Sequence, residues 1–170
     1  MAGSFRNVDP ETLNENAFKL IGTEWMLITP GTMKSFNTMT ASWGSLGILW
    51  GKKVATCVIR PVRYTFEFME REPVFTLSFF DRKYRDALNL CGSKSGRDMD
   101  KVKATGLVPV ASPSGGVYFE QARLVLECRK LYWHDLDPKH FLDPKIEVNY
   151  PKKDYHRMYV GEITNCLAAD

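Results

Sequence analysis

Apolar and polar residues alternate along several short stretches of this chain, with the period of two that is typical of β-strands. The strongest of these covers residues 74–80, where β-branched and aromatic residues predominate. A longer one covers residues 117–133, where Leu124 and Leu126 alternate with Arg123. Further strands are predicted over residues 25–29, 36–42, 48–50, 54–59 and 155–166.

A second pattern, with apolar residues three or four positions apart, predicts short helices. Leu13, Ala17, Phe18 and Ile21 follow this spacing after an Asp-Pro-Glu start, and Gly22 is expected to close the helix. Other helices are predicted over residues 64–69, 84–90 and 97–105, and three prolines make residues 138–151 irregular.

The order of these elements indicates the fold class. Strands do not alternate regularly with long helices, which argues against a doubly wound parallel sheet. A mainly β chain, folded as an antiparallel barrel with short inserted helices, fits the pattern better. The 170 residues contain no internal repeat or linker, so a single domain over residues 1–170 is expected.

Composition narrows the class of partner. The chain is 44% hydrophobic and 25% charged, as is usual for a globular protein, and its net charge of +3 is too small to indicate nucleic acid. No apolar run approaches the roughly 18 residues of a membrane span, and residues 1–6 lack a signal-peptide core. A cytoplasmic location without membrane contact is therefore expected.

The four cysteines give no metal-binding pattern. Cys57, Cys91, Cys128 and Cys166 contain no C-x-x-C pair and no zinc-ligand spacing to a histidine. Cys57 and Cys128 lie in apolar strand-like runs and are predicted to be buried thiols, as suits a reducing compartment. No metal is expected.

Candidate chemistry begins with Asn37-Thr38-Met39-Thr40-Ala41-Ser42-Trp43-Gly44. Alternation places Thr38, Thr40 and Ser42 on one face of a strand and residues 37, 39, 41 and 43 on the other. Small hydroxyls and exposed backbone groups could meet the polar edge of a flat ring. The alternative is that Thr and Ser simply suit a half-exposed strand.

A second segment, Arg60-Pro61-Val62-Arg63-Tyr64-Thr65, suits an anion. Its two guanidinium groups favour phosphate, and the start of the following helix adds a favourable dipole. The alternative pairs these arginines with Glu67 and Glu70 on the helix. Taken with the strand, the segment suits a phosphorylated aromatic cofactor such as FMN.

Two weaker signals follow. Cys91-Gly92-Ser93-Lys94-Ser95-Gly96-Arg97-Asp98 has the composition of a phosphate-binding loop but lacks the spacing of a nucleotide-triphosphate loop, and it could be a plain connector. His156 opens the last strand, where it could contact a ring, exchange a proton near neutral pH, or do neither. Neither a hydrolytic triad nor a G-x-G-x-x-G motif occurs.

In this order, five segments resemble the flavin reductase-like family of FMN-binding split-barrel proteins, which includes flavoredoxin. They span roughly residues 25–165. The segments are Asn37-Thr38-Met39-Thr40-Ala41-Ser42-Trp43-Gly44, Arg60-Pro61-Val62-Arg63-Tyr64-Thr65, Phe75-Thr76-Leu77-Ser78-Phe79-Phe80, Cys91-Gly92-Ser93-Lys94-Ser95-Gly96-Arg97-Asp98 and His156-Arg157-Met158-Tyr159-Val160-Gly161-Glu162.

The resemblance implies a six-stranded antiparallel Greek-key split β-barrel, a homodimer, and one FMN per subunit near the dimer interface. Residues 37–43 would follow the flavin ring, Phe79 and Phe80 would flank the site, and His156, the candidate catalytic residue, would lie near the ring or a nicotinamide. The implied FMN-binding residues are Asn37, Thr38, Met39, Thr40, Ala41, Ser42, Trp43, Arg60, Arg63, Tyr64, Thr65, Ser78, Phe79, Phe80, Cys91, Gly92, Ser93, Lys94, Ser95, Gly96 and Lys101.

Within this set, Arg60, Arg63 and Thr65, with residues 93–101, would serve the ribityl-phosphate tail. Lys101 or the strand backbone would also donate hydrogen bonds near the N1/C2 edge of the ring.

Three functions stay open from the sequence. The first is a flavin reductase that passes hydride from NADH or NADPH to flavin. The second is a flavoredoxin-like electron carrier that holds FMN tightly and exchanges electrons with a redox protein. The third is a flavin-free β-barrel binding module.

Overall fold

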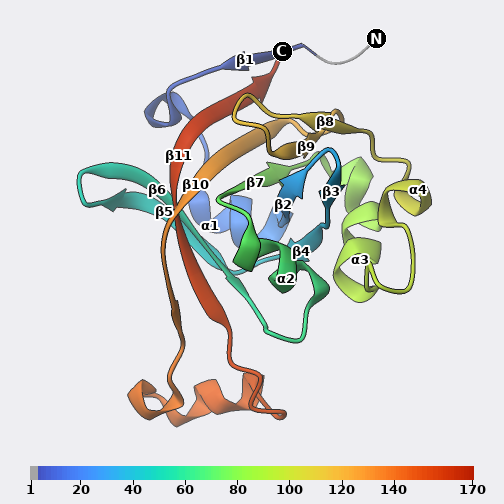
Figure 1. Ribbon diagram of the computed structural model, residues 1–170. Coiled ribbons are helices and arrows are strands. Elements are labelled where there is room, and N and C mark those ends of the chain that lie inside the picture. Colours follow the sequence, from blue (N-terminus) through green and yellow to red (C-terminus); the bar gives the residue numbers. More distant parts are fainter. Residues whose placement is uncertain (1–3) are drawn as a thin grey trace.

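Six antiparallel strands close into a barrel in the computed structural model, which describes residues 4–170 (Figure 1). Strand β4 pairs with β2, β5 pairs with β6, and only two residues separate β4 from β5. The two short strands therefore act as one, and the sheet closes on itself. In ring order the strands are β2 (Met26–Thr32), β7 (Val74–Phe79), β10 (Leu124–Asp135), β11 (Arg157–Ala169), β6 (Lys52–Ile59), β5 (Gly44–Leu49) and β4 (Met39–Ala41).

Shorter strands and helices lie around this barrel. Strand β1 (Phe5–Asn7) pairs with β11, β3 (Ser35–Phe36) pairs with β2, and β8 (Pro109–Ala111) pairs with β9 (Val117–Phe119). The helices are α1 (Ala17–Lys19), α2 (Tyr64–Arg71), α3 (Arg85–Ser93) and α4 (Lys101–Thr105). The short 3₁₀ helices are η1 (Pro10–Thr12), η3 (Arg82–Tyr84), η4 (Pro138–His140) and η5 (Pro144–Asn149), and η2 (Leu20–Glu24) is a π-helix.

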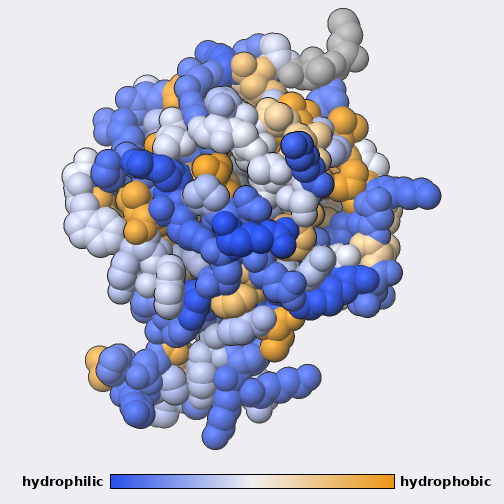
Figure 2. Space-filling view, in the orientation of Figure 1, coloured by the Kyte–Doolittle hydropathy of each residue, from blue (hydrophilic) through white to orange (hydrophobic). Residues whose placement is uncertain are grey.

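Strands β10 and β11 extend beyond the barrel as a long arm. Figures 1 and 2 show this arm below the main body, with η4 and η5 at its far end. Hydrophilic side chains cover most of the face seen in Figure 2, and hydrophobic ones form small separate patches.

The barrel interior is built by alternation. Phe75, Leu77 and Phe79 of β7 enter one apolar cluster, together with Leu126 of β10 and Tyr159 of β11. Intervening residues face outward, where Leu27 and Val125 form a second cluster beneath α3 and β9. The mainly β, antiparallel barrel predicted from the sequence is therefore confirmed.

The predicted N-terminal helix is wrong in extent. Asp9 caps η1, but Leu13 is extended and Asn16 then caps a new start, with its Oδ1 accepting a hydrogen bond from the Lys19 N–H at 3.1 Å. Two competing caps thus divide one amphipathic stretch. Gly22 lies inside η2 instead of closing the helix, and Trp25, with φ of 71°, follows its end.

The predicted strand over residues 36–42 is divided at Asn37 and Thr38. The buried Asn37 side chain donates from Nδ2 to the Thr65 hydroxyl at 2.8 Å, and Thr38 shares a hydrogen bond with the Thr29 hydroxyl at 2.9 Å. Side-chain bonds with α2 and β2 thus interrupt the stretch between β3 and β4.

The predicted Gly/Ser loop and the helix after it also differ from the expectation. Cys91, Gly92 and Ser93 form the last residues of α3, and α4 begins only at Lys101. Asp100 caps α4 by accepting from the Lys103 N–H, and Gly106, at φ of 70°, ends it as expected.

The described residues contain no helix that is both long and apolar enough to cross a membrane. All four cysteines are free and buried, as predicted for Cys57 and Cys128. Within residues 4–170, no group of three or more His, Cys, Asp or Glu side chains is placed to hold a metal ion.

Candidate functional site

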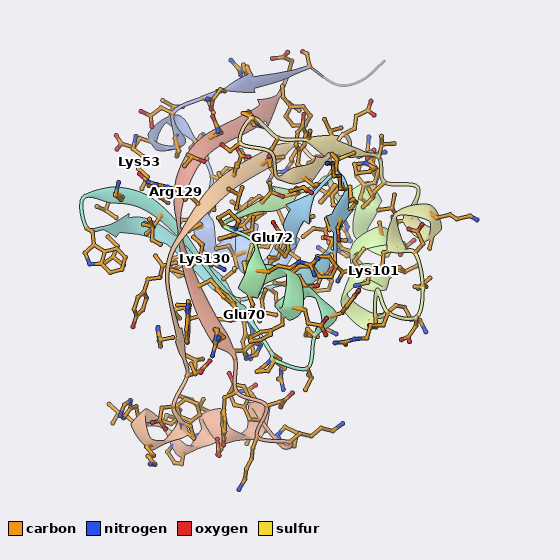
Figure 3. All side chains as sticks on the ribbon, in the orientation of Figure 1. Lys53, Glu70, Glu72, Lys101, Arg129 and Lys130 are labelled. Atoms are coloured by element: carbon orange, nitrogen blue, oxygen red, sulfur yellow. The ribbon has the colours of Figure 1, made fainter. Side chains whose placement is uncertain are left out.

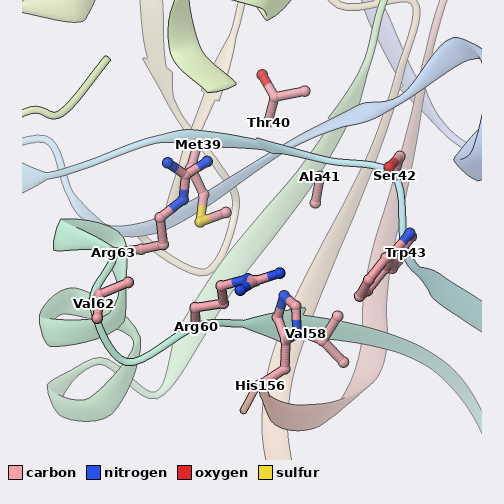
Figure 4. Close-up of a pocket in the computed structure, with 10 residues that line it drawn as sticks. All are labelled: Met39, Thr40, Ala41, Ser42, Trp43, Val58, Arg60, Val62, Arg63 and His156. Atoms are coloured by element: carbon pink, nitrogen blue, oxygen red, sulfur yellow. The ribbon is translucent and has the colours of Figure 1, made fainter. Parts of the chain in front are cut away.

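A surface cavity of about 340 Å³ lies where β4 passes the end of β6 (Figure 4). Its wall unites three segments that the sequence singled out: the strand at residues 39–43, the Arg60–Arg63 turn and His156. The lining residues are Met39, Thr40, Ala41, Ser42, Trp43, Val58, Arg60, Val62, Arg63 and His156.

The β4 strand presents its apolar face to this cavity. Figure 4 shows Met39, Ala41 and Trp43 directed toward Arg60, whereas Thr40 points the other way. The Thr40 hydroxyl donates to the Leu88 carbonyl of α3, and Gly92 packs against the same threonine. The Thr38 and Thr40 hydroxyls therefore fasten β4 to its neighbours.

Neither Arg60 nor Arg63 pairs with Glu67 or Glu70 of α2, which bond to other arginines. Arg60 forms an ion pair with Asp154 at 2.9 Å and donates to the Asn149 carbonyl at 2.8 Å, so the arm orients it. Arg63 donates to the Gly92 carbonyl at 2.6 Å and makes no ion pair with the described carboxylates. Burial, and then the nearby Arg60 charge, lower the pKa of Arg63. An anion would relieve this unfavourable environment.

His156 is a neutral ring in this cavity. The residue is 9% exposed, its Nδ1 hydrogen-bonds the Tyr150 hydroxyl at 2.8 Å, and its ring centroid lies 5.1 Å from that of Trp43. Burial, followed by the charge of Arg60, lowers the pKa of His156 to about 4. The lowered pKa therefore disfavours proton exchange by His156 near neutral pH.

A smaller cavity of about 70 Å³ adjoins the first and shares Met39, Val62 and Arg63 with it. It lies at the N-terminus of α2, whose N-cap residue, Arg63, makes no side-chain capping bond. Free backbone N–H groups, the helix dipole and nearby cations all favour an anion there. The full lining is Asn37, Met39, Val62, Arg63, Tyr64, Thr65, Lys94, Ser95, Gly96 and Lys101.

Lys101 joins this smaller cavity from α4, beside α3 (Figure 3). Its ammonium is buried and donates to the carbonyls of Thr38 and Cys91, both at 2.8 Å. Desolvation, with a smaller contribution from the charge of Arg63, lowers the pKa of Lys101 to about 8. One cation thus ties the start of β4 to the end of α3 and leaves a third N–H for a ligand.

Several residues expected at the site lie outside both cavities. Ser78 is buried in β7, Phe79 is inside the barrel, and Phe80 packs under α3 beside a different cavity. Cys91 and Gly92 contribute carbonyls that orient Lys101 and Arg63. The Ser93 hydroxyl bonds back to Asn89 within α3.

Sequence reasoning missed the residues that position the site. Asp154 and Tyr150 orient Arg60 and His156, but they lie in the stretch around the predicted irregular segment, where no periodic pattern marks them. Val58 and Val62 also line the cavity. They lie on either side of Arg60 in the sequence. The only sequence signal for them was that a predicted strand ends there and a proline turn follows.

Solved structures share this fold at low sequence identity. An FMN-binding domain of a flavin reductases-like enzyme from Shewanella baltica is similar with a TM-score of 0.72 and 16% identity, over 99% of this chain and 79% of that one. Flavoredoxin of Desulfovibrio vulgaris gives 0.67 and 19%, over 96% and 77%. An NADH:FAD oxidoreductase from Streptomyces globisporus gives 0.66 and 14%, over 86% and 75%.

No curated protein matches the chain. The profile of the family described as "Flavin reductase like domain" matches residues 18–170. This match spans most of the sequence and includes every residue of both cavities. The chain therefore belongs to the flavin reductase-like domain family.

Proposed function

We propose that this chain binds FMN across the two joined cavities. The observation that carries the proposal is their pairing, in which a cavity that has the apolar face of β4 along one wall leads into a cationic cavity suited to a phosphate. The larger has a volume of about 340 Å³, within the range of about 300–1,000 Å³ that is typical of small-molecule sites. The two share Met39, Val62 and Arg63, so a single ligand can occupy both.

The ring would lie along β4. Met39 and Ala41 offer apolar contact, and Trp43 and His156 offer aromatic faces at the far end. Because the hydroxyls of Thr38 and Thr40 are already bonded within the protein, hydrogen bonds to the ring edge would come from other groups. The strand backbone and the free N–H of Lys101 are the candidates.

The phosphate would occupy the smaller cavity. Arg63 supplies a charge that no described carboxylate neutralises, and Lys94 and Lys101 add two more. The uncapped N–H groups at the start of α2 complete the donor set.

We further propose that the protein is an NAD(P)H:flavin oxidoreductase. When bound, FMN would supply the ring that accepts a hydride, and the protein would bind and orient both partners. His156 is neutral at pH 7, so a nicotinamide can approach it without desolvating a charge.

Steady-state oxidation of NADH and NADPH by the purified protein with FMN tests the enzyme proposal. Consumption that depends on protein and on FMN is the expected result. If neither nucleotide is consumed while bound FMN is reduced by dithionite or a redox protein, the carrier function replaces the reductase.

The exposed apolar side chains support a homodimer as the working form. Several gather on the β5–β6 hairpin and the first half of the arm, where Trp50 and Tyr132 pack edge to face at 6.0 Å. Large apolar groups left in water on one set of elements indicate a protein interface. The set comprises Ile48, Leu49, Trp50, Tyr132 and Trp133.

A further inference from the structure

The far end of the arm returns to the candidate site through Tyr150. This residue follows η5 and is 4% exposed. Its hydroxyl lies 2.8 Å from His156 Nδ1, and its ring centroid lies 5.1 Å from the Arg60 guanidinium. Tyr150 lines neither cavity of the candidate site, so it lies behind His156 and Arg60 as seen from the ligand's side. One buried side chain of the arm therefore contacts two residues of the cavity wall.

The hydrogen bond between Tyr150 and His156 has a defined direction. His156 is neutral near pH 7, so one of its two ring nitrogens carries a proton and the other accepts. Burial raises the pKa of Tyr150, which therefore keeps its hydroxyl proton. Within residues 4–170, that proton has no acceptor other than His156 Nδ1. The hydroxyl therefore donates, Nδ1 accepts, and the ring proton is placed on Nε2.

The Nε2 atom of His156 is the one left for a ligand. It makes no hydrogen bond within residues 4–170 and, unlike His134 Nδ1, it is not enclosed by the protein. Arg60 directs its N–H groups elsewhere, to Asp154 at 2.9 Å and to the Asn149 carbonyl at 2.8 Å. The imidazole lies in the cavity wall beside Arg60 (Figure 4). Its Nε2–H is therefore a free donor at the ring end of the site.

We propose that Tyr150 is a positioning residue, which holds His156 in the Nε2–H tautomer so that this N–H donates to a carbonyl oxygen of a bound ring. A flavin ring and a nicotinamide carboxamide both present such an oxygen. In the opposite tautomer, a nitrogen lone pair would face the cavity and repel it. The identity of the ligand rests on the proposed function, whereas the tautomer is a property of the chain itself.

Selective ¹⁵N labelling of histidine tests the positioning in the flavin-free protein, because the chain has three histidines. Long-range ¹H–¹⁵N correlation spectra distinguish protonated from unprotonated ring nitrogens, and His156→Gln identifies the His156 signals by their loss. At pH 7 we expect a protonated Nε2 and an unprotonated Nδ1. Tyr150→Phe should add a population with the proton on Nδ1. A protonated Nδ1 in the unmodified protein, or an unchanged tautomer in Tyr150→Phe, would overturn the proposal.

The FMN dissociation constant and the KM for NADH test the donor role. Tyr150→Phe removes the hydroxyl and keeps the ring that stacks on Phe141 at 6.0 Å. We expect one of the two constants to rise about two- to tenfold, the size of one lost hydrogen bond. Tyr155→Phe is the matched control, because its hydroxyl belongs to the same aromatic cluster but bonds Glu147 at 2.7 Å. It should change neither constant.

The two constants also identify the acceptor. A weaker FMN complex assigns the carbonyl oxygen to the flavin, and a higher KM for NADH at constant FMN affinity assigns it to the nicotinamide. No change in either constant would overturn the donor role.

A double variant separates positioning from a general effect on the fold. If Tyr150 acts through His156, adding Tyr150→Phe to His156→Gln should cause no further loss. A further loss, or an equal loss in Tyr155→Phe, would overturn the proposal. If the unmodified protein binds no flavin, the proposed function fails and the donor role fails with it, while the spectra still decide whether Tyr150 sets the tautomer.

Discussion

Arg63 is the side chain on which the phosphate end of the site depends most. It lies between the two cavities, and the described carboxylates leave its charge unneutralised. By contrast, the charge of Arg60 is already paired with Asp154. The sequence suggested the same phosphate-binding role for both arginines, but their contacts in the structure differ.

We predict that Arg63→Ala weakens FMN far more than riboflavin, which lacks the phosphate. Loss of a charge-assisted hydrogen bond costs about 1.5–3 kcal/mol, or roughly a 10- to 150-fold change in dissociation constant. Titration of both flavins measures it. Arg129→Ala, which alters a pair with Glu162 outside both cavities, is the control. Equal weakening of both ligands would show that Arg63 is structural.

His156 gives the site a pH dependence of folding. Because burial lowers its folded pKa from 6.5 to about 4, the unfolded chain binds more protons between these values. Its contribution to stability is therefore complete above about pH 6.5 and is lost as the pH falls toward 4. The change amounts to about 3 kcal/mol at most.

Urea unfolding of the native protein and of His156→Gln across this pH range measures the effect. The unmodified protein should lose stability more steeply with acid than the variant, which has no imidazole to titrate. Parallel curves would mean that His156 titrates normally in the folded protein.

At the scale of elements, alternation predicted the strands because burial on one face leaves a period of two in the sequence. Residues 74–80 and 117–133 gave β7, β9 and β10 on this basis. The first helix was mispredicted because Asp9 and Asn16 each cap a separate start. Likewise, the break at Asn37 depends on Thr65, a partner 28 residues away. Such long-range partners leave no local pattern.

The segment that connects α3 to α4 should tolerate no side chain at Gly96, where it lies against Asn37. Gly96→Ala places a Cβ atom 2.1 Å from Asn37 Oδ1, so either Asn37 or the connection must move. We expect FMN affinity to fall about tenfold, because the shift would remove about one charge-assisted contact at the phosphate end. Gly47→Ala in β5 has open space around its Cβ and is the control. Equal FMN affinities in the two variants would show that the contact between Gly96 and Asn37 does not shape the site.

At the scale of the whole molecule, the sequence predicted the barrel but not how its segments meet. Residues 39–43, 60–63 and His156 converge on one cavity, although they lie far apart in the sequence. Phe79 and Phe80 do not join them, because strand alternation buries Phe79 in the barrel and packs Phe80 beneath α3. The arm residues that orient Arg60 and His156 could be found only from the fold.

The exposed apolar set predicts self-association. Light scattering during size exclusion should give twice the mass of the 19.4 kDa chain. A Trp50→Glu/Tyr132→Glu variant should elute as a monomer, since charges are costly to bury in an interface. Phe18→Glu, a similarly exposed apolar residue outside this set, is the control. A monomeric unmodified protein would contradict the proposal.

The central claim is that the paired cavities hold FMN with its phosphate at the N-terminus of α2. The most direct test is a titration of flavin-free protein with FMN, followed by flavin fluorescence and visible absorbance, in the presence and absence of inorganic phosphate. We predict saturable binding with one FMN per chain, a perturbed flavin spectrum, and competition by phosphate. Unchanged flavin fluorescence and absorbance at every protein concentration would contradict it.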